Sequence, residues 1–132
     1  MRASIAYETE AQMRTAVKAL NEAMPVVRMK DRFTDVIASG YRDINMNVRM
    51  PSGHIGEVQL HMEAILDAKK NMGGHDIYEE IRTIFANAWK VNAPLTEAEF
   101  NRVEELTKQS RDLYDYVLAR AQTGGRRARI NG

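Results

Sequence analysis

Residues 40–61, GYRDINMNVRMPSGHIGEVQLH, decide the fold of this chain. Polar and apolar residues alternate along both halves of the segment, as they do in strands whose successive side chains point to opposite faces. The odd positions carry Tyr41, Asp43, Asn45, Asn47, Arg49, Glu57, Gln59 and His61, and the even positions carry Ile44, Met46, Val48, Met50, Val58, Leu60 and Met62. The pattern predicts two strands, over residues 41–50 and 55–62, with one polar face and one apolar face.

A tight turn joins the two strands. Pro51-Ser52-Gly53 predicts it, because proline presets φ and glycine accepts positive φ. A three-residue loop pairs Asn47 with Glu57 and Asn45 with Gln59 on the same side of the sheet. Exposed hairpins favour Lys, Glu and Thr, whereas on this face Glu57 stands among amides. The face therefore indicates a binding site, and a half-exposed hairpin without a role is the alternative.

The flanking sequence adds two strands and a helix. Residues 2–7 and 26–33 read as strands. Between them, Thr9 and Gln12 predict a capping box at the start of a helix, and Pro25 ends that helix.

After the hairpin, apolar residues recur with helical spacing. A short helix ends at Gly73-Gly74, and an amphipathic helix follows it. Thr96 and Glu99 predict a second capping box, which opens a long helix to about Gln122, before Gly124-Gly125. The order predicts an α+β fold, with a small, mainly antiparallel sheet and helices packed on it.

Composition and length limit the functional classes. The 132 residues suit one domain, which we expect over residues 1–123, followed by a basic flexible tail over 124–132. The chain has no cysteine, and its formal net charge is +1. No apolar run reaches the roughly 18 residues of a membrane span, and the N-terminus has no signal peptide. We therefore expect a soluble, cytoplasmic protein with no membrane partner.

Several motifs stand in a characteristic order along the chain. They are Arg28-Met29-Lys30-Asp31, Gly40-Tyr41-Arg42, Gly56-Glu57-Val58-Gln59-Leu60 and His75-x-x-Tyr78. Together they resemble the synthetase domain of RelA/SpoT-type alarmone enzymes, which make (p)ppGpp. The resemblance runs from Arg2 to about Arg82, and the long C-terminal helix is similar to that of short or toxin-like members of the family.

The resemblance implies an activity and its central residues. Enzymes of this family transfer pyrophosphate from ATP to the 3′-hydroxyl of a purine nucleotide and use magnesium. By resemblance, Glu57 binds magnesium and activates the acceptor hydroxyl, and Gln59 supports it. Tyr41 stacks on the acceptor base, a contact worth about 1–3 kcal/mol.

The resemblance also implies the residues around the nucleotide. Arg28 and Lys30 lie near acceptor phosphates, Asp31 helps to hold that strand and loop, and Arg2 faces the nucleotide. Two further positions on the nucleotide side differ from the family pattern, because Asn45 replaces a histidine and His61 replaces an arginine.

The sequence leaves several functions open. The resemblance places the ATP-binding segment and a second magnesium ligand upstream of Met1, so we expect the chain to lack that half of the site. It is then either a pyrophosphokinase or a catalytically incomplete nucleotide-binding or interaction module. The expected partners are GDP, GTP or an adenosine nucleotide, ATP if the chain is active, and a second copy or a larger protein. A nucleic acid held by the C-terminal arginines ranks last, because the net charge is near zero.

Overall fold

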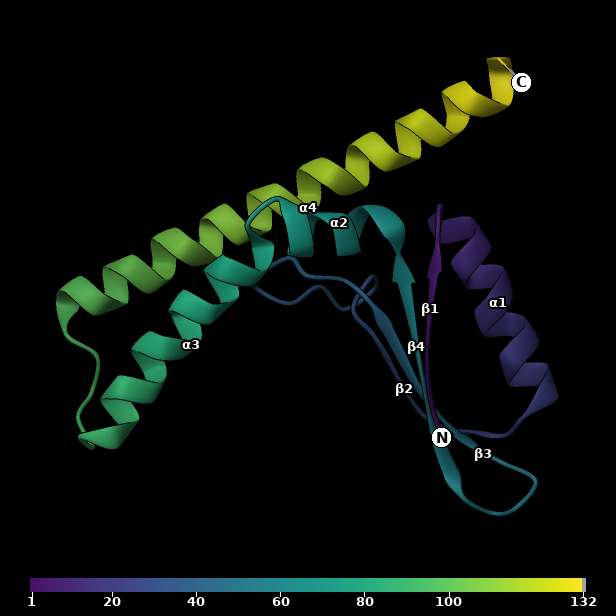
Figure 1. The fold of residues 1–132 in the computed structure, drawn as a ribbon, viewed down its shortest axis with the longest axis horizontal. Helices are drawn as coiled ribbons and strands as arrows, with labels where there is room; N and C mark the ends of the chain where they lie inside the picture. Colours follow the sequence, from purple (N-terminus) through teal and green to yellow (C-terminus); the bar gives the residue numbers. More distant parts are fainter. Residues whose placement is uncertain (132) are drawn as a thin grey trace.

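The computed structural model describes the backbone of residues 1–131 and the side chains of residues 1–122. Figure 1 shows a sheet at the centre, with helices at one side and across its upper end. The strands are β1 (Arg2–Tyr7), β2 (Val26–Asp31), β3 (Ile44–Arg49) and β4 (Ile55–Met62), and the helices are α1 (Glu10–Ala23), α2 (Glu63–Asn71), α3 (Gly74–Lys90) and α4 (Glu97–Asn131). The predicted α+β class, with a long C-terminal helix, is confirmed.

The sheet has the strand order β1-β4-β3-β2. β1 runs parallel to β4, and the other two pairs are antiparallel. In the hairpin, Asn45 pairs with Gln59 and Asn47 with Glu57, which confirms the predicted register. Gly53 adopts a φ of +90° in the turn between β3 and β4, in the left-handed region that favours glycine.

Two strands are shorter than the sequence predicted. β2 ends at Asp31 rather than at residue 33, because the Asp31 carboxylate accepts hydrogen bonds from the backbone N–H groups of Phe33 (2.9 Å) and Thr34 (3.1 Å) and turns the chain. β3 begins at Ile44 rather than at residue 41. The residues before it are bound to α4 instead of pairing along their length with a strand.

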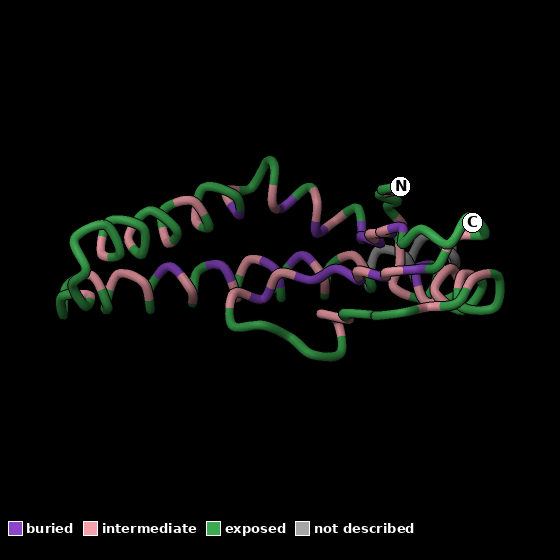
Figure 2. The backbone as a smooth tube through the Cα atoms, turned by 90° about the horizontal axis from the view of Figure 1, so that it is seen from below, coloured by how far each residue is buried: buried purple, intermediate pink, exposed green. Residues whose placement is uncertain are grey.

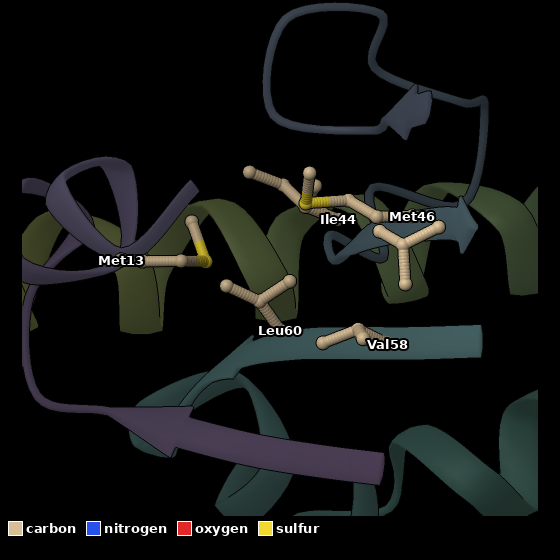
Figure 3. Packing of buried hydrophobic residues seen from close by; sticks show 6 residues of the cluster. Met13, Ile44, Met46, Val58 and Leu60 are labelled. Atoms are coloured by element: carbon tan, nitrogen blue, oxygen red, sulfur yellow. The ribbon is translucent and has the colours of Figure 1, made fainter. Parts of the chain in front are cut away.

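The apolar face of the sheet packs against α1. Figure 3 shows Met13 of α1 directed toward the side chains of β3 and β4. The fully or almost fully buried residues of this first core are Met13, Ile44, Met46, Val48, Val58 and Leu60. The predicted capping box fixes the start of α1, because Thr9 Oγ1 accepts from Gln12 N (3.1 Å) and Gln12 Oε1 accepts from Thr9 N (3.3 Å).

A second core lies where β4 runs into α2. Its buried residues are Met62, Ile65, Ala68, Tyr114 and Val117, contributed by the end of β4, by α2 and by α4. From here α3 and the first third of α4 (residues 97–109) project away from the sheet as an antiparallel pair, which we call the arm (Figure 1). The second predicted capping box opens α4, since Thr96 and Glu99 exchange hydrogen bonds of 2.9 and 3.1 Å.

The backbone of α4 continues as a helix through Gly124 and Gly125, where the sequence predicted its end. The side chains of residues 123–131 and all of residue 132 lie outside the described part of the chain. The division into a domain over 1–123 and a basic tail over 124–132 therefore stays a prediction. Among the described residues, no helix is both long enough and apolar enough to cross a membrane.

Candidate functional site

The polar face of the sheet gathers most of the predicted site residues. The strand register gives two neighbouring rows on this face: Arg2, Glu57, Asn47 and Arg28 in one, and Ser4, Gln59, Asn45 and Lys30 in the next. A register shift between Val26 and Arg28 places both cationic side chains of β2 on this face. Within the part of the chain whose side chains are described, neither hydrophobic core includes a residue of these rows.

Glu57 lies in the middle of the face and is held by two amides. Its Oε1 accepts hydrogen bonds from Asn45 Nδ2 (3.0 Å) and Gln59 Nε2 (2.9 Å), and its Oε2 lies 3.7 Å from Arg2 Nε. The hydrogen bonds from Asn45 and Gln59 and the charge of Arg2 hold the pKa of Glu57 below its ordinary value. Glu57 is therefore an ionised carboxylate with one oxygen bound by the protein and the other facing a cation.

Asn45 has an acceptor left over. Because its Nδ2 must face the Glu57 carboxylate, its Oδ1 points elsewhere, and this buried oxygen has no hydrogen-bond partner in the structure. Buried polar atoms are nearly always paired, and exceptions call for an explanation such as a ligand or a water molecule. Asn45 is therefore both a support for Glu57 and a candidate acceptor for a donor group on a ligand.

Cationic side chains stand at both edges of the sheet, with Glu57 between them. Arg28 and Lys30 are exposed on the edge strand β2, and the Arg2 side chain is exposed on the opposite edge strand β1. Guanidinium and ammonium groups are the usual protein partners of phosphate oxygens. A polyanion that crosses the sheet would meet positive charge at both edges and Glu57 between them.

Tyr41 lies beyond the start of β3, at the end of the face where α2 and α4 pack. Its ring makes an edge contact with Tyr114, with centroids 5.7 Å apart and planes at 79°, and Lys69 Nζ lies 5.3 Å from the ring centroid. Burial, with a contribution from the charge of Asp43, raises the pKa of the Tyr41 phenol well above its ordinary value. The ring is half-buried and fixed in position; its predicted stacking on a base stays a prediction.

The loop that carries Tyr41 is bound to α4. Ser110 Oγ donates to the Ser39 carbonyl (2.7 Å), and Arg42 Nη2 donates to Asp115 Oδ1 (2.8 Å). Gly40 has a φ of +77°, and a Cβ there would lie 3.0 Å from Arg111 Cα. These contacts have no local sequence signal, because they join residues about seventy positions apart.

Two polar residues at the same end of the face are buried. Asp43 and His61, expected on the solvated side of the hairpin, are only 5% and 6% exposed. Asp43 forms an ion pair with Arg32. Burial lowers the pKa of His61, although the charge of Asp43 acts in the opposite direction, so the imidazole is neutral at pH 7, and its Nδ1 has no partner in the structure. The solvated face predicted from alternation therefore ends before this row.

Asp31 is the one predicted site residue on the other face. Its register partner is Ile44 of the first core, and its carboxylate binds Arg14 of α1 and the hydroxyl of Thr34 (3.0 Å). Burial favours a higher pKa, but the hydrogen bonds from Arg14 and Thr34 keep the pKa of Asp31 below its ordinary value. Asp31 binds the backbone at the end of β2, and it does not join the residues on the polar face.

A small pocket includes Lys69, the residue whose ammonium group lies near the Tyr41 ring. It has a volume of about 370 Å³ and is lined by Lys69, Lys70, His75 and Asp76, at the corner between α2 and α3. Lys69 therefore contributes both to the surroundings of the Tyr41 ring and to this pocket. The histidine of the predicted His75-x-x-Tyr78 motif lies here, in the first turn of α3.

The polar face offers magnesium a carboxylate oxygen of Glu57. Among the residues with described side chains, no group of three or more His, Cys, Asp or Glu gathers as a metal cage. Magnesium in nucleotide sites is often held by one or two carboxylates together with phosphate oxygens and water. Glu57 Oε2 supplies one such oxygen, so the face fits a magnesium ion that arrives with a phosphorylated substrate.

No family model and no curated protein matches this chain. Solved structures do match. The type VI effector Tas1, in complex with its immunity protein, is 18% identical with a TM-score of 0.59 over 86% of this chain and 63% of that one. Small alarmone synthetase 1 from Bacillus subtilis, bound to its product pppGpp, is 16% identical with a TM-score of 0.48 over 98% of this chain and 62% of that one.

This chain thus spans less than two thirds of the length of either of these solved proteins. At these identities the likeness concerns the fold. The type VI effector Tas1 shares the fold of this chain, and small alarmone synthetases are among the solved structures to which the chain is similar, in line with the RelA/SpoT-type resemblance of the sequence motifs.

Proposed function

We propose that the polar face of the sheet is the nucleotide site of a RelA/SpoT-like pyrophosphokinase, which transfers pyrophosphate from ATP to the 3′-hydroxyl of a purine nucleotide. One observation carries the proposal. An ionised carboxylate, Glu57, is oriented by two amides in the centre of an open sheet face, and cations stand at both edges of that face. Pyrophosphoryl transfer depends chiefly on positioning and on stabilisation of phosphate charge, which are the two capacities of such a face.

The acceptor nucleotide would lie toward β2. Its base would stack on the exposed part of the Tyr41 ring, and its phosphates would meet Arg28 and Lys30. Arg2, on the opposite edge, would face the transferred phosphates. With the base at Tyr41 and the phosphates at β2, the ribose would lie near Glu57. The reaction requires the 3′-hydroxyl at that position.

Glu57 would orient the acceptor hydroxyl. Its Oε2 accepts the hydrogen bond from the 3′-hydroxyl. The hydroxyl oxygen then forms a bond to the β-phosphorus of ATP, the bond from that phosphorus to the oxygen of the leaving AMP breaks, and the hydroxyl proton passes to Glu57 Oε2. Because its pKa is held low, Glu57 is a weak base and contributes more by orientation than by early proton removal. Magnesium, held by Glu57 and substrate phosphates, would neutralise charge on the phosphates.

An activity assay tests the proposal. The purified chain is incubated with Mg²⁺, labelled ATP and, in separate reactions, GDP, GTP and adenosine nucleotides, and products are separated by chromatography. We expect label on one class of acceptor, and a loss of at least 100-fold in Glu57→Gln. Lys18→Met, at an exposed position of α1, is the matched control and should retain activity. Equal activity in Glu57→Gln and in the unchanged protein would reject the role of Glu57.

A second candidate is a nucleotide-binding module without catalysis. The presence of a single carboxylate, Glu57, in the two rows of the face favours it, since such sites often use two. Titration calorimetry with GDP and GTP separates the candidates. Binding that weakens about tenfold in Lys30→Met but not in Lys18→Met, without transfer to any acceptor, would support the module.

A further inference from the structure

Two buried atoms on the polar face have no hydrogen-bond partner. They are Asn45 Oδ1 and His61 Nδ1, and among the described side chains no other buried nitrogen or oxygen is left unpaired. Buried positions, purple in Figure 2, run along the middle of the molecule, and His61 is one of them, with 6% of its surface exposed. Since buried polar groups are nearly always paired, two exceptions on one face call for a shared explanation.

The strand register makes these two residues neighbours. Asn45 pairs with Gln59, and His61 lies two residues further along β4 on the same face. Asn45 and His61 are therefore diagonal neighbours, which lie about 7–8 Å apart, so one small group between them can contact both. Both positions also differ from the RelA/SpoT-type motif pattern, so the pair is a feature of this chain.

The two unpaired atoms together favour a hydroxyl group. Asn45 Oδ1 can only accept a hydrogen bond, whereas Nδ1 of a neutral imidazole can carry the proton and donate it. A hydroxyl donates one hydrogen bond and accepts another, so it satisfies both atoms at once. A phosphate oxygen has no proton for Asn45, and an amino group fits only if Nδ1 carries no proton.

We propose that Asn45 and His61 bind the ribose 2′-hydroxyl of the acceptor nucleotide, and that the pair selects ribonucleotides over 2′-deoxyribonucleotides. This inference rests on the proposed function. Asn45 Nδ2 is bound to Glu57 Oε1 (3.0 Å), so the Oδ1 of the same amide stands beside the carboxylate that receives the 3′-hydroxyl. Two neighbouring acceptors match the two neighbouring hydroxyls of a ribose.

The order of residues along the face agrees with the order of groups on a nucleoside. The row of Glu57 is followed by the row of Asn45. His61 comes next along β4, and Tyr41 lies beyond the start of β3 at the same end. On a nucleoside, the 3′-hydroxyl, the 2′-hydroxyl and the base follow one another around the sugar. With the base on Tyr41 and the 3′-hydroxyl at Glu57, the 2′-hydroxyl comes between them.

Access to the pair involves Lys69 of α2. Solvent does not reach the two unpaired atoms, so a side chain must move before a ligand can bind them. The Lys69 ammonium lies 5.3 Å from the centroid of the Tyr41 ring, and its charge acts on the imidazole of His61. A base that stacks on Tyr41 takes the place of this ammonium. Base stacking thus opens the end of the face at which the 2′-hydroxyl binds.

Calorimetry on the unchanged chain tests the pair directly. With Mg²⁺ present, the affinities of GDP and ADP are each compared with those of their 2′-deoxy forms. We expect the deoxy form to bind at least tenfold more weakly, because it leaves two buried groups unpaired. Equal affinities would overturn this inference and leave the proposed function standing. If none of these nucleotides bound, both would be overturned.

Substitutions at His61 separate recognition from damage to the fold. His61→Leu should weaken the ribonucleotide several-fold and leave the deoxy form nearly unchanged, so the ratio of the two affinities falls toward one. His61→Asn retains a donor close to the position of Nδ1 and should keep most of the ratio. His54→Leu, at the exposed histidine of the turn, is the matched control and should keep all of it. Equal weakening of both forms by His61→Leu would indicate a purely structural role and overturn the proposal.

Inosine diphosphate distinguishes the sugar hydroxyl from the 2-amino group of guanine. It lacks the amino group and keeps the hydroxyl, so His61→Leu should leave the ratio of the GDP and inosine diphosphate affinities unchanged. If His61→Leu reduced this ratio and left the ratio for the deoxy form intact, the pair would bind the base, and the proposal would be wrong.

Discussion

The sheet with α1 and the projecting arm are built from similar amphipathic patterns, yet they bury them to different extents. α1 places Met13 fully inside the first core, against residues of β3 and β4. α3 has an equally regular stripe, but its isoleucines remain half-buried and Trp89 is almost fully exposed. The difference teaches that periodicity predicts a helix and its apolar side, whereas the element that covers this side is decided by topology.

Truncation of a core residue should separate the two regions most clearly. Leu60→Ala removes a fully buried side chain from the first core and should lower the free energy of unfolding by about 2–5 kcal/mol. Ile81→Ala, in the arm, should cost about 1 kcal/mol, because its side chain is only half-buried. Urea denaturation at low protein concentration measures both. Equal losses would show that the arm is buried as deeply as the sheet.

The contact between the loop that carries Tyr41 and α4 depends on Gly40. Gly40→Ala should cost about 2–3 kcal/mol, since φ is +77° and the new Cβ would lie 3.0 Å from the backbone of Arg111. Gly53→Ala is the matched control: its φ is +90°, but a Cβ there meets no atom within 4 Å, so we expect about 1 kcal/mol. Thermal unfolding of the two variants gives the comparison. If Gly40→Ala were no worse than Gly53→Ala, the loop would not be held tightly against α4.

Removing the capping threonine from α1 and from α4 applies the same chemical change to the sheet region and to the arm. Thr9→Ala at α1 and Thr96→Ala at α4 each remove one side-chain cap, worth about 1 kcal/mol. If the regions unfold together, both variants should shift the urea midpoint equally. If the arm opens first, Thr96→Ala should instead speed amide hydrogen exchange in α3 and the start of α4 while the midpoint stays the same.

The smallest expected effect concerns pH. Burial holds the pKa of His61 below its ordinary 6.5, so the unfolded chain takes up the proton first as the pH falls. The contribution of neutral, buried His61 to the free energy of unfolding is therefore complete above pH 6.5 and is lost as the pH falls below this value. The free energy of unfolding should decrease between pH 7.5 and 5.5, and the decrease should be smaller in His61→Asn.

Much of the sheet could be predicted because its information is local. The alternation of polar and apolar residues and the turn at 51–53 predicted the hairpin and its register. They also predicted the face on which Glu57, Asn45 and Gln59 lie. The Thr9 and Thr96 caps gave two helix starts to the residue. The motif resemblance added Arg2, Arg28 and Lys30, and the strand register brings these to the same face, although their roles stay predictions.

The remaining features depend on contacts between distant residues. Nothing local shows that Arg42, inside a motif, is buried and bound to Asp115, or that the Asp43 and His61 row is covered. The register shift at β2, which turns Arg28 and Lys30 to the polar face, has no glycine or proline to announce it. Alternation also failed at the ends of β2 and β3, where Asp31 and Arg42 bind backbone groups that a longer strand would have used.

The parallel pairing of β1 with β4 has a consequence for synthesis of the protein. β1 comes before the other three strands of this sheet along the described chain, but its neighbour in the sheet is β4, the last of the four. At about 5–20 residues per second, a ribosome leaves β1 unpaired for several seconds while α1, β2 and β3 emerge. During this interval its backbone donors and acceptors are open to other nascent chains, so cells that translate this message heavily should depend on chaperones that shield the first strand.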